Sequence, residues 1–182
     1  MNLEAVELHA DLIDRCRSGN PQAYQQLYKL YARSMYNTGY RIVNDPDEAK
    51  DVLQESFISA FRNLDSYRGD ASFGSWLKRI VINKAINVIK KRRMERMPEQ
   101  EEWDFAEPAD TTEHEFPFSI DAVRQGIDQL PDGYRTVLSL YLIEGYDHSE
   151  IAFILGISES TSKSQFNRSK KKLLELLERR LK

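Results

Sequence analysis

The sequence has few of the residues that cross-link or turn a chain. Cys16 is its single cysteine, so no internal disulfide can form, and a reducing compartment suits this composition best. Eight glycines and six prolines among 182 residues argue against a β-rich fold dense in turns. The longest apolar runs, such as residues 151–157, are about seven residues long, whereas a membrane-spanning helix needs about 20. We therefore expect no insertion into a membrane.

Signals for export and for common enzyme chemistry are also missing. The first residues, MNLEAVELHADLID, are acidic and lack the basic and apolar segments of a signal peptide, so a cytoplasmic protein is expected. Neither a P-loop nor a GxGxxG motif occurs, and the three histidines do not pair with Cys16 at metal-ligand spacing. We expect no enzymatic activity, no cofactor and no metal site.

Charge is distributed unevenly along the chain, although the net charge is only −3. Residues 78–97 contain eight basic side chains and one acidic one, and residues 159–182 contain eight basic and three acidic ones. Between these blocks, residues 98–121 contain nine acidic side chains and no basic one. A DNA phosphate is attracted by the basic side chains near it rather than by the net charge of the protein, so the two basic blocks indicate a protein that binds a polyanion.

Hydrophobic periodicity predicts an all-α fold made of two small helical domains. In residues 47–64 the apolar side chains follow the spacing of an amphipathic helix, and no segment alternates as a strand does. Further helices are expected from Pro21 and over residues 72–93, 119–129, 131–143, 147–155 and 159–180. The acidic stretch with its three prolines predicts a flexible linker over residues 97–118, between domains at residues 1–96 and 119–182.

The last two predicted helices have the layout of a helix-turn-helix. Asp147 and Glu150 stand three residues apart, as in a capping box, and Gly156 can end the first helix in a left-handed conformation. Ser158 can then cap the second helix. In proteins of this kind the second helix enters the major groove, so the C-terminal domain is predicted to bind duplex DNA.

The second of these helices has a divided surface. An inward side is expected for Ser162, Phe166, Ser169, Leu173 and Leu177. The other side carries small polar and basic side chains, which suit base edges and phosphates: Lys163, Ser164, Asn167, Arg168 and Lys171. The alternative is an amphipathic helix hairpin whose lysines face only solvent.

The predicted helix over residues 72–93 has a second exposed stripe. At about 100° per residue, one arc of about 80° contains an aromatic residue, two amides and two basic residues: Trp76, Arg79, Asn83, Asn87 and Lys90. In a single strand the unpaired bases can stack on aromatic rings and form hydrogen bonds with amides through their edges, while the phosphates contact basic side chains. The alternative is that Trp76 and Phe73 are core residues covering the start of the helix.

A mixed stripe is expected on the helix that follows Pro46. It contains acidic, amide, apolar and basic side chains: Asp51, Gln54, Glu55, Ile58 and Arg62. Acidic groups repel DNA, and Ile58 adds an exposed apolar contact. The stripe therefore predicts a docking face for a basic protein, with ordinary solvated charge as the alternative.

Two long segments, taken together, resemble a known family. The segment DPDEAKDVLQESFISAFRNLDSYRGDASFGSWLKRIVINKAINVIKKRR resembles region 2 of the extracytoplasmic-function sigma factors of the sigma-70 family. The segment LPDGYRTVLSLYLIEGYDHSEIAFILGISESTSKSQFNRSKKKLLELL is similar to their region 4. The order of the regions, the short chain and the acidic linker also fit, so the resemblance covers most of the sequence.

The resemblance implies a sigma factor, a dissociable subunit of bacterial RNA polymerase that selects promoters and helps to open them. The first domain would dock on the clamp helices of the large polymerase subunit through Asp51, Gln54, Glu55 and Ile58. Contacts to the single-stranded −10 element would come from Arg68, Asp70, Ser72, Phe73, Trp76, Arg79, Asn83, Asn87 and Lys90. Contacts to the duplex −35 element would come from Ser160, Thr161, Lys163, Ser164, Gln165, Asn167, Arg168 and Lys171. An anti-sigma factor that occludes the polymerase face is a further expected partner.

Two positions depart from the pattern of the family. Ser162 stands where an apolar residue usually fills the hairpin, and Gln165 stands where arginine is frequent. Both changes bear on the affinity for the −35 element rather than on the fold. An autonomous helix-turn-helix regulator is the competing hypothesis, in which the N-terminal domain senses a ligand or dimerises. Comigration with core polymerase in gel filtration separates the two.

Overall fold

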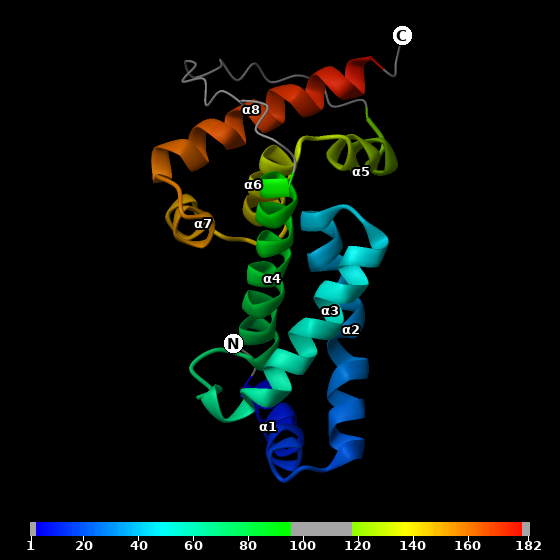
Figure 1. The fold of residues 1–182 in the computed structure, drawn as a ribbon, viewed down its shortest axis with the longest axis vertical. Helices are drawn as coiled ribbons and strands as arrows, with labels where there is room; N and C mark the ends of the chain where they lie inside the picture. Colours follow the sequence, from blue (N-terminus) through cyan, green and yellow to red (C-terminus); the bar gives the residue numbers. More distant parts are fainter. Residues whose placement is uncertain (1–2, 96–117, 180–182) are drawn as a thin grey trace. The chain divides into compact units, whose positions relative to one another are not determined.

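The computed structural model describes residues 3–95 and 118–179, with side chains from His9 onward in the first range. In this part of the chain the fold is all-α, as predicted (Figure 1). The chain divides into two compact units, Met1–Val88 and Ile89–Lys182. The predicted linker at residues 97–118 lies outside the described residues except for Phe118, so its flexibility stays a prediction.

The first unit is built from four helices and a single turn of 3-10 helix. Their bounds are α1 (Leu3–Arg17), α2 (Pro21–Val43), α3 (Pro46–Arg62), η1 (Leu64–Ser66) and α4 (Phe73–Glu95), with the division between units falling inside α4. Asn20 caps α2, because its Oδ1 accepts hydrogen bonds from the N–H groups of Gln22 (3.0 Å) and Ala23 (3.1 Å). Asn44, at a φ of 54°, ends the same helix in the left-handed region.

The helix α1 was not among the elements predicted from the sequence. Its second half places Leu12, Ile13 and Cys16 in the core, and it packs against α2 and η1. These three side chains give a short apolar pattern, and the first residues of the chain are acidic. The helix is stabilised by tertiary contacts that the local sequence does not reveal.

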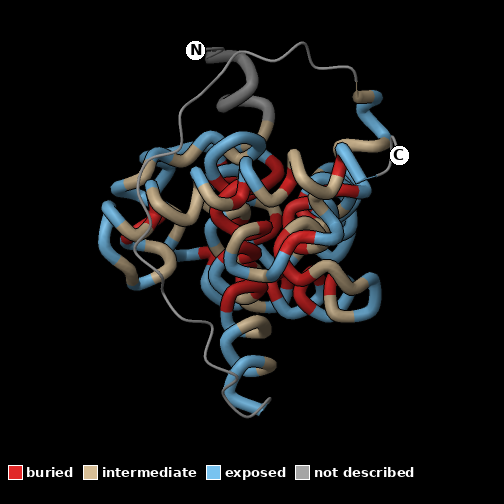
Figure 2. The backbone as a smooth tube through the Cα atoms, turned by 90° about the horizontal axis from the view of Figure 1, so that it is seen from above, coloured by how far each residue is buried: buried red, intermediate tan, exposed pale blue. Residues whose placement is uncertain are grey.

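The core of the first unit lies where α2, α3 and α4 approach one another. Figure 2 shows the buried residues on the inward-facing parts of the helices and the exposed residues on the outside. Leu27, Ile42 and Leu77 are among its fully buried side chains. Gly39 allows the close approach, because a Cβ there would lie 3.3 Å from Cγ1 of Val52 and 3.6 Å from Cγ1 of Val81. This packing fixes one face of α4 inward and leaves the opposite face available for contacts.

The second unit contains the helices α5 (Ile120–Asp128), α6 (Asp132–Leu142), α7 (His148–Leu155) and α8 (Glu159–Glu178). Leu130, Leu138, Leu173 and Leu177 form its core, and α8 packs on the other three helices. Gly126 brings α5 close to α8, since a Cβ at this position would lie 2.7 Å from Cδ1 of Leu173. Among the helices of the described ranges, none has the length and apolar character needed to cross a bilayer.

Candidate nucleic-acid interface

The loop over residues 67–72 joins η1 to the first turn of α4. Gly69 has a φ of 83°, a left-handed conformation that turns the chain. Ser72 ends the loop as a cap of α4, because its Oγ accepts a hydrogen bond from the N–H of Ser75 (3.2 Å). The Tyr67 hydroxyl donates to the carbonyl oxygen of Ala71 (2.8 Å), which closes the loop upon itself.

Phe73, one of the residues predicted to contact the −10 element, lies in the core of the first unit. Its side chain is only 2% exposed, and its ring lies 5.4 Å from that of Tyr31 and 5.6 Å from that of Tyr67. At about 100° per residue Phe73 lies about 60° from Trp76, at the edge of the buried arc of α4. The ring is therefore a core residue in this structure, which agrees with the alternative interpretation of the sequence for Phe73.

The rest of the predicted −10 set lies along one accessible surface. Arg68, Asp70 and Ser72 in the loop are exposed, and Trp76 is half-buried. Four further side chains of α4 are exposed: Arg79, Asn83, Asn87 and Lys90. The buried arc extends farther toward Arg79 than predicted, because Ile82 and Ile86 are buried. Val88 and Ile89, expected on the buried side, are only half-buried. The two amides nevertheless share one face, as the spacing predicted.

The mixed stripe on α3 is accessible throughout. Asp51, Gln54 and Glu55 are exposed, and the side chain of Ile58 is 49% exposed. One contact was not foreseen: Nζ of Lys84 on α4 lies 3.4 Å from Oε2 of Glu55. A shallow groove runs beside this ion pair, lined by Glu55, Ile58, Ser59, Arg62, Asn63 and Lys84.

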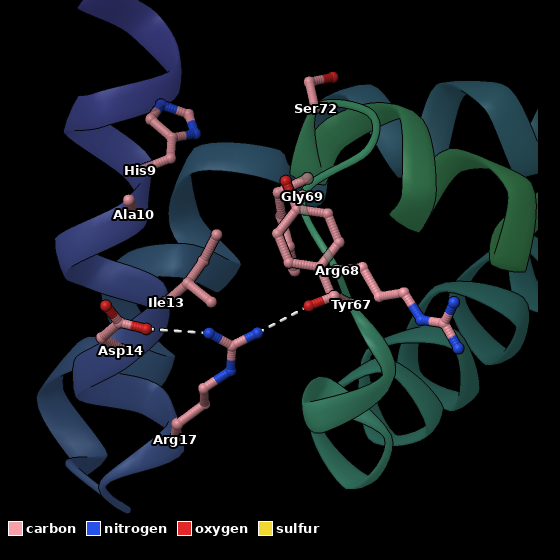
Figure 3. Close-up of a pocket in the computed structure, with 10 residues that line it drawn as sticks. His9, Ala10, Ile13, Asp14, Arg17, Tyr67, Arg68, Gly69 and Ser72 are labelled. Carbon is pink, nitrogen blue, oxygen red and sulfur yellow. Dashed lines mark hydrogen bonds and ion pairs between the residues drawn. The ribbon is translucent and has the colours of Figure 1, made fainter.

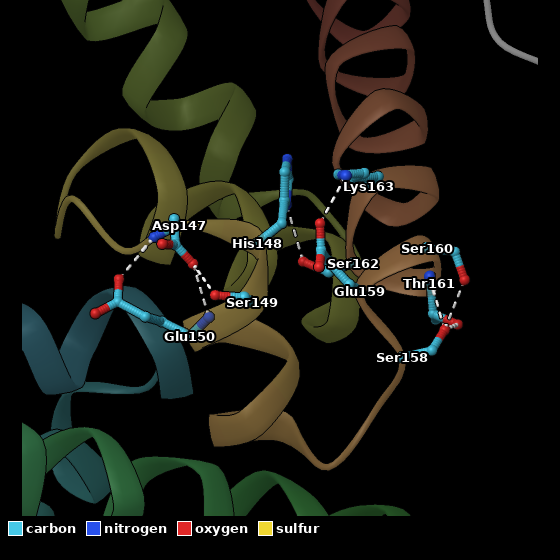
Figure 4. A network of polar contacts seen from close by, with 10 residues as sticks. All are labelled: Asp147, His148, Ser149, Glu150, Ser158, Glu159, Ser160, Thr161, Ser162 and Lys163. Atoms are coloured by element: carbon cyan, nitrogen blue, oxygen red, sulfur yellow. Dashed lines mark hydrogen bonds and ion pairs between the residues drawn. The ribbon is translucent and has the colours of Figure 1, made fainter.

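The helix-turn-helix has the caps that the sequence predicted (Figure 4). Asp147 accepts a hydrogen bond from the N–H of Glu150 (2.8 Å), and the Glu150 carboxylate accepts one from the N–H of Asp147 (2.9 Å). Gly156 ends α7 at a φ of 71°. Ser158 then accepts a hydrogen bond from the N–H of Thr161 (3.0 Å) and starts α8. The Asp147 carboxylate accepts hydrogen bonds from the Glu150 N–H and from the Ser149 hydroxyl, which lower the pKa of this carboxyl group.

Ser162, the polar residue where the family usually has an apolar one, is fully buried between α7 and α8. Its hydroxyl lies 3.0 Å from Nδ1 of His148, so the hydroxyl has a partner inside the hairpin. The His148 ring stacks on Tyr141 at 4.5 Å and meets Phe166 edge-on at 5.6 Å. Burial in this aromatic setting lowers the pKa of His148. A hydrogen bond between the buried Ser162 hydroxyl and the half-buried His148 ring thus stands where the family usually has an apolar contact.

The predicted −35 residues divide into two groups on α8. Four are exposed and fall within one arc of about 80° of the helix: Ser160, Lys163, Asn167 and Lys171. The other four are half-buried and turn progressively away from this arc: Thr161, Ser164, Gln165 and Arg168. Gln165 is farthest from the arc and lies toward α6, where its Oε1 would be 4.0 Å from a Cβ at Gly133. Gln165 and Thr161 therefore do not share the exposed stripe.

Two basic side chains of α8 have contrasting surroundings. Lys163 is exposed and pairs with Glu159 across one helical turn (2.6 Å), and this hydrogen bond raises the pKa of Lys163. Arg168 is half-buried, and its Nη2 is enclosed without a hydrogen-bond partner among the described residues. An enclosed guanidinium nitrogen costs free energy until an acceptor reaches it.

Comparison with known proteins identifies both halves. A family model for sigma-70 region 2 matches residues 27–95, and one for sigma-70 region 4 matches residues 120–173. RNA polymerase sigma-H factor of Pseudomonas aeruginosa is 32% identical over 94% of this chain and 95% of its own length. The ECF RNA polymerase sigma factor SigW of Bacillus subtilis is 30% identical over 91% of this chain and 94% of its own. The chain belongs to the extracytoplasmic-function sigma factors of the sigma-70 family.

Solved structures agree with the fold of this sigma factor. The structure of CnrH in complex with the cytosolic domain of CnrY matches with a TM-score of 0.54 and 25% identity, covering 92% of this chain and 95% of that one. RpoE from Bartonella quintana, solved with the anti-sigma factor NepR, matches in fold with a TM-score of 0.58 and 21% identity, covering 85% and 96%. The region 2 match contains α3, α4 and most of α2, while α1 precedes it.

Proposed function

We propose that this RNA polymerase sigma factor binds core polymerase, recognises the −10 and −35 promoter elements and promotes melting of the DNA. The observation that carries the proposal is the pair of exposed stripes, one on α4 and one on α8, which differ in chemistry. The stripe on α4 joins two amides to basic groups beside a half-buried indole. The stripe on α8 joins hydroxyl, amide and lysine side chains on the second helix of the helix-turn-helix.

The surface of α4 suits an unpaired strand. Asn83 and Asn87 can bond the edges of bases that a duplex would keep paired, and Trp76 offers part of an aromatic ring. Arg79 and Lys90 are placed to neutralise phosphates on the same face. Melting is favoured because the opened strand makes contacts that duplex DNA cannot make, so no nucleotide hydrolysis is required.

The surface of α8 suits the major groove of duplex DNA. Lys163 and Lys171 can approach phosphates while Asn167 between them reaches a base edge. Neither the α4 surface nor the α8 surface needs to bind tightly alone. Polymerase would hold both units on one promoter, and the second contact then forms at high effective concentration.

The stripe on α3 is the proposed docking face for the clamp helices of the large polymerase subunit. Its acidic groups and the exposed Ile58 suit a basic partner with an apolar contact point. An anti-sigma factor that covers this face would prevent docking. RpoE from Bartonella quintana, a sigma factor of the same fold, has been solved in complex with the anti-sigma factor NepR. The protein would act in the cytoplasm, with polymerase and DNA.

Run-off transcription with core polymerase on a library of genomic promoters tests this function. We expect transcripts from a limited set of promoters and permanganate-reactive thymines in their −10 regions. The double variant Trp76→Ala, Asn83→Ala should reduce permanganate reactivity at least tenfold while leaving −35 duplex binding within about twofold, since each base contact contributes about 1–3 kcal/mol. Asn37→Ala, which removes an exposed amide on α2, is the matched control. Failure to comigrate with core polymerase would refute the proposal.

A further inference from the structure

Arg17, at the end of α1, reaches across to the loop that precedes α4. Its Nη2 donates a hydrogen bond to the backbone carbonyl oxygen of Tyr67 at 2.7 Å, across fifty residues of sequence. Its Nη1 donates to the carboxylate of Asp14 at 2.9 Å, so the guanidinium lies between the two acceptors (Figure 3). Because a guanidinium is planar, two such contacts fix its orientation as well as its position.

Tyr67 is the residue through which this contact can control the loop. Its hydroxyl donates to the carbonyl oxygen of Ala71, so the side chain of Tyr67 spans the loop that its own backbone begins. Its ring lies 5.6 Å from that of Phe73 and 5.4 Å from that of Trp76. Fixing the Tyr67 carbonyl therefore fixes the loop and the side of Trp76 that meets it.

Among the described side chains, a cavity separates much of the loop from α1. A cavity of about 210 Å³ lies between them, lined by His9, Ile13 and Arg17 on one side and by Tyr67, Gly69 and Ser72 on the other. A Cβ at Gly69 would meet nothing within 4 Å, so the middle of the loop is not packed. With a cavity in place of direct packing, the charge-assisted bond of Arg17 is the principal polar connection described here.

We propose that Arg17 is a positioning residue, which holds the loop over residues 67–72 in the conformation that receives the unpaired −10 strand. The inference rests on the proposed function, because the loop carries Arg68 and Asp70 of the −10 surface. The Arg68 side chain extends away from α1, so Arg17 supports the loop from the other side (Figure 3). Arg17 also precedes the region 2 match, which begins at residue 27.

The first experiment measures the loop without DNA. Trp76 and Trp103 are the two tryptophans of the chain, so Trp103→Phe leaves Trp76 as the single reporter. In the full-length chain we expect Arg17→Ala to raise quenching of Trp76 by acrylamide, because Tyr67 no longer shields the indole. Arg15→Ala is the matched control, since Arg15 lies on the same helix and pairs with Asp11 at 4.0 Å. Equal quenching in the parent and Arg17→Ala would overturn the inference.

The second experiment uses holoenzyme and a pool of randomised single-stranded DNA 12-mers. We expect Arg17→Ala to weaken retention of the pool about tenfold and to flatten its base preferences, while Arg15→Ala leaves both unchanged. Arg17→Lys should be intermediate, because a lysine can reach the Tyr67 carbonyl but cannot contact Asp14 through a second nitrogen. Binding to a −35 duplex and the thermal unfolding midpoint should stay unchanged, which separates positioning from loss of fold.

The outcomes distinguish the inference from the function on which it rests. If the unaltered holoenzyme retains the pool and Arg17→Ala retains it equally well, Arg17 has no positioning role and the proposed function stands. If the unaltered holoenzyme retains no single strand, the proposed function fails and the inference fails with it. If Arg17→Ala unfolds the first unit, the Arg17→Lys holoenzyme provides the test instead. Retention of the single-stranded pool by Arg17→Lys equal to that by the parent would then overturn the inference.

Discussion

The two helices that carry the proposed DNA contacts, α4 and α8, are held in place by different chemistry. Behind the start of α4 lies an aromatic cluster, in which Phe73 contacts Tyr31 and Tyr67. The start of α8 is held by hydroxyl groups, with Ser158 as its cap and Ser162 bonded to His148. Because aromatic packing supports α4 from behind, its outer face can carry amide and basic side chains. The polar caps of α8 instead give this helix a hydroxyl-rich N-terminal end that suits the major groove of DNA.

The largest expected effect distinguishes the residues of α4 that stabilise the fold from those proposed to contact DNA. Phe73→Ala should lower the free energy of unfolding by about 3–5 kcal/mol, as truncation of a buried aromatic ring does. Asn83→Ala, on the exposed face of the same helix, should change it by less than about 0.5 kcal/mol. Urea unfolding of the full chain, followed by circular dichroism, measures both. A loss below about 1 kcal/mol for Phe73→Ala would show that the ring is not a core residue.

A smaller effect is expected on α8, and it concerns salt rather than stability. Lys171→Ala and Arg168→Ala should each lower the slope of log K against log salt for a −35 duplex by about one, the value for one phosphate contact. For Arg168 the reason is its positive charge, which a phosphate beside the half-buried side chain would neutralise. Fluorescence anisotropy of holoenzyme with the duplex at several salt concentrations measures the slopes.

Arg124→Ala is the control for these slopes, because Arg124 is an exposed basic residue on α5 that forms an ion pair with Asp121 at 3.9 Å. Its removal should leave the slope unchanged. A slope that Arg168→Ala does not alter would remove Arg168 from the phosphate contacts and leave the exposed stripe of α8 as the whole surface. Retention of the single-stranded pool should be the same for all three variants, since they lie outside the surface of α4.

The same contrast shows what the sequence could and could not predict. The caps at Asp147, Gly156 and Ser158 follow local rules, and the structure confirms each of them. Ser162 and Leu173 were likewise placed inward by helical spacing, and both are buried. Contacts decided within one turn of helix are therefore open to prediction from sequence.

The features that escaped prediction depend on residues far apart in the chain. The helix α1 has a short apolar pattern and is stabilised by its packing on α2 and η1, so periodicity alone did not reveal it. For Phe73 the spacing left both a surface and a core position open, and its contacts with Tyr31 and Tyr67 decide for the core. The contact of Arg17 with Tyr67 joins two segments fifty residues apart and has no signature in either. The contacts with polymerase and promoter DNA remain predictions.

The smallest expected effect concerns the polar contact between His148 and Ser162 behind α8, and it depends on pH. Burial lowers the pKa of His148 from its ordinary value of 6.5, so the unfolded chain takes up a proton at a higher pH than the folded one. The stability that neutral His148 provides is therefore complete above pH 6.5 and is lost as pH falls through 6.5 toward the lowered pKa.

Between pH 7.5 and 5.5 the free energy of unfolding of the second unit, measured in urea, should fall by less than about 1 kcal/mol, because solvent partly screens the half-buried ring. The variant His148→Gln should lose less over the same interval. The Asp147 cap does not contribute in this interval, because its pKa lies below 3.8 and its protonation requires stronger acid. Ser162→Ala should be less stable than the parent by about 1 kcal/mol at pH 7.5, as loss of one hydrogen bond predicts, while keeping the dependence on pH. If the free energy of unfolding falls equally in His148→Gln and in the parent, the pH dependence belongs to another group. The hydrogen bond of the Ser162 hydroxyl would then stabilise the hairpin without a contribution from the protonation of His148.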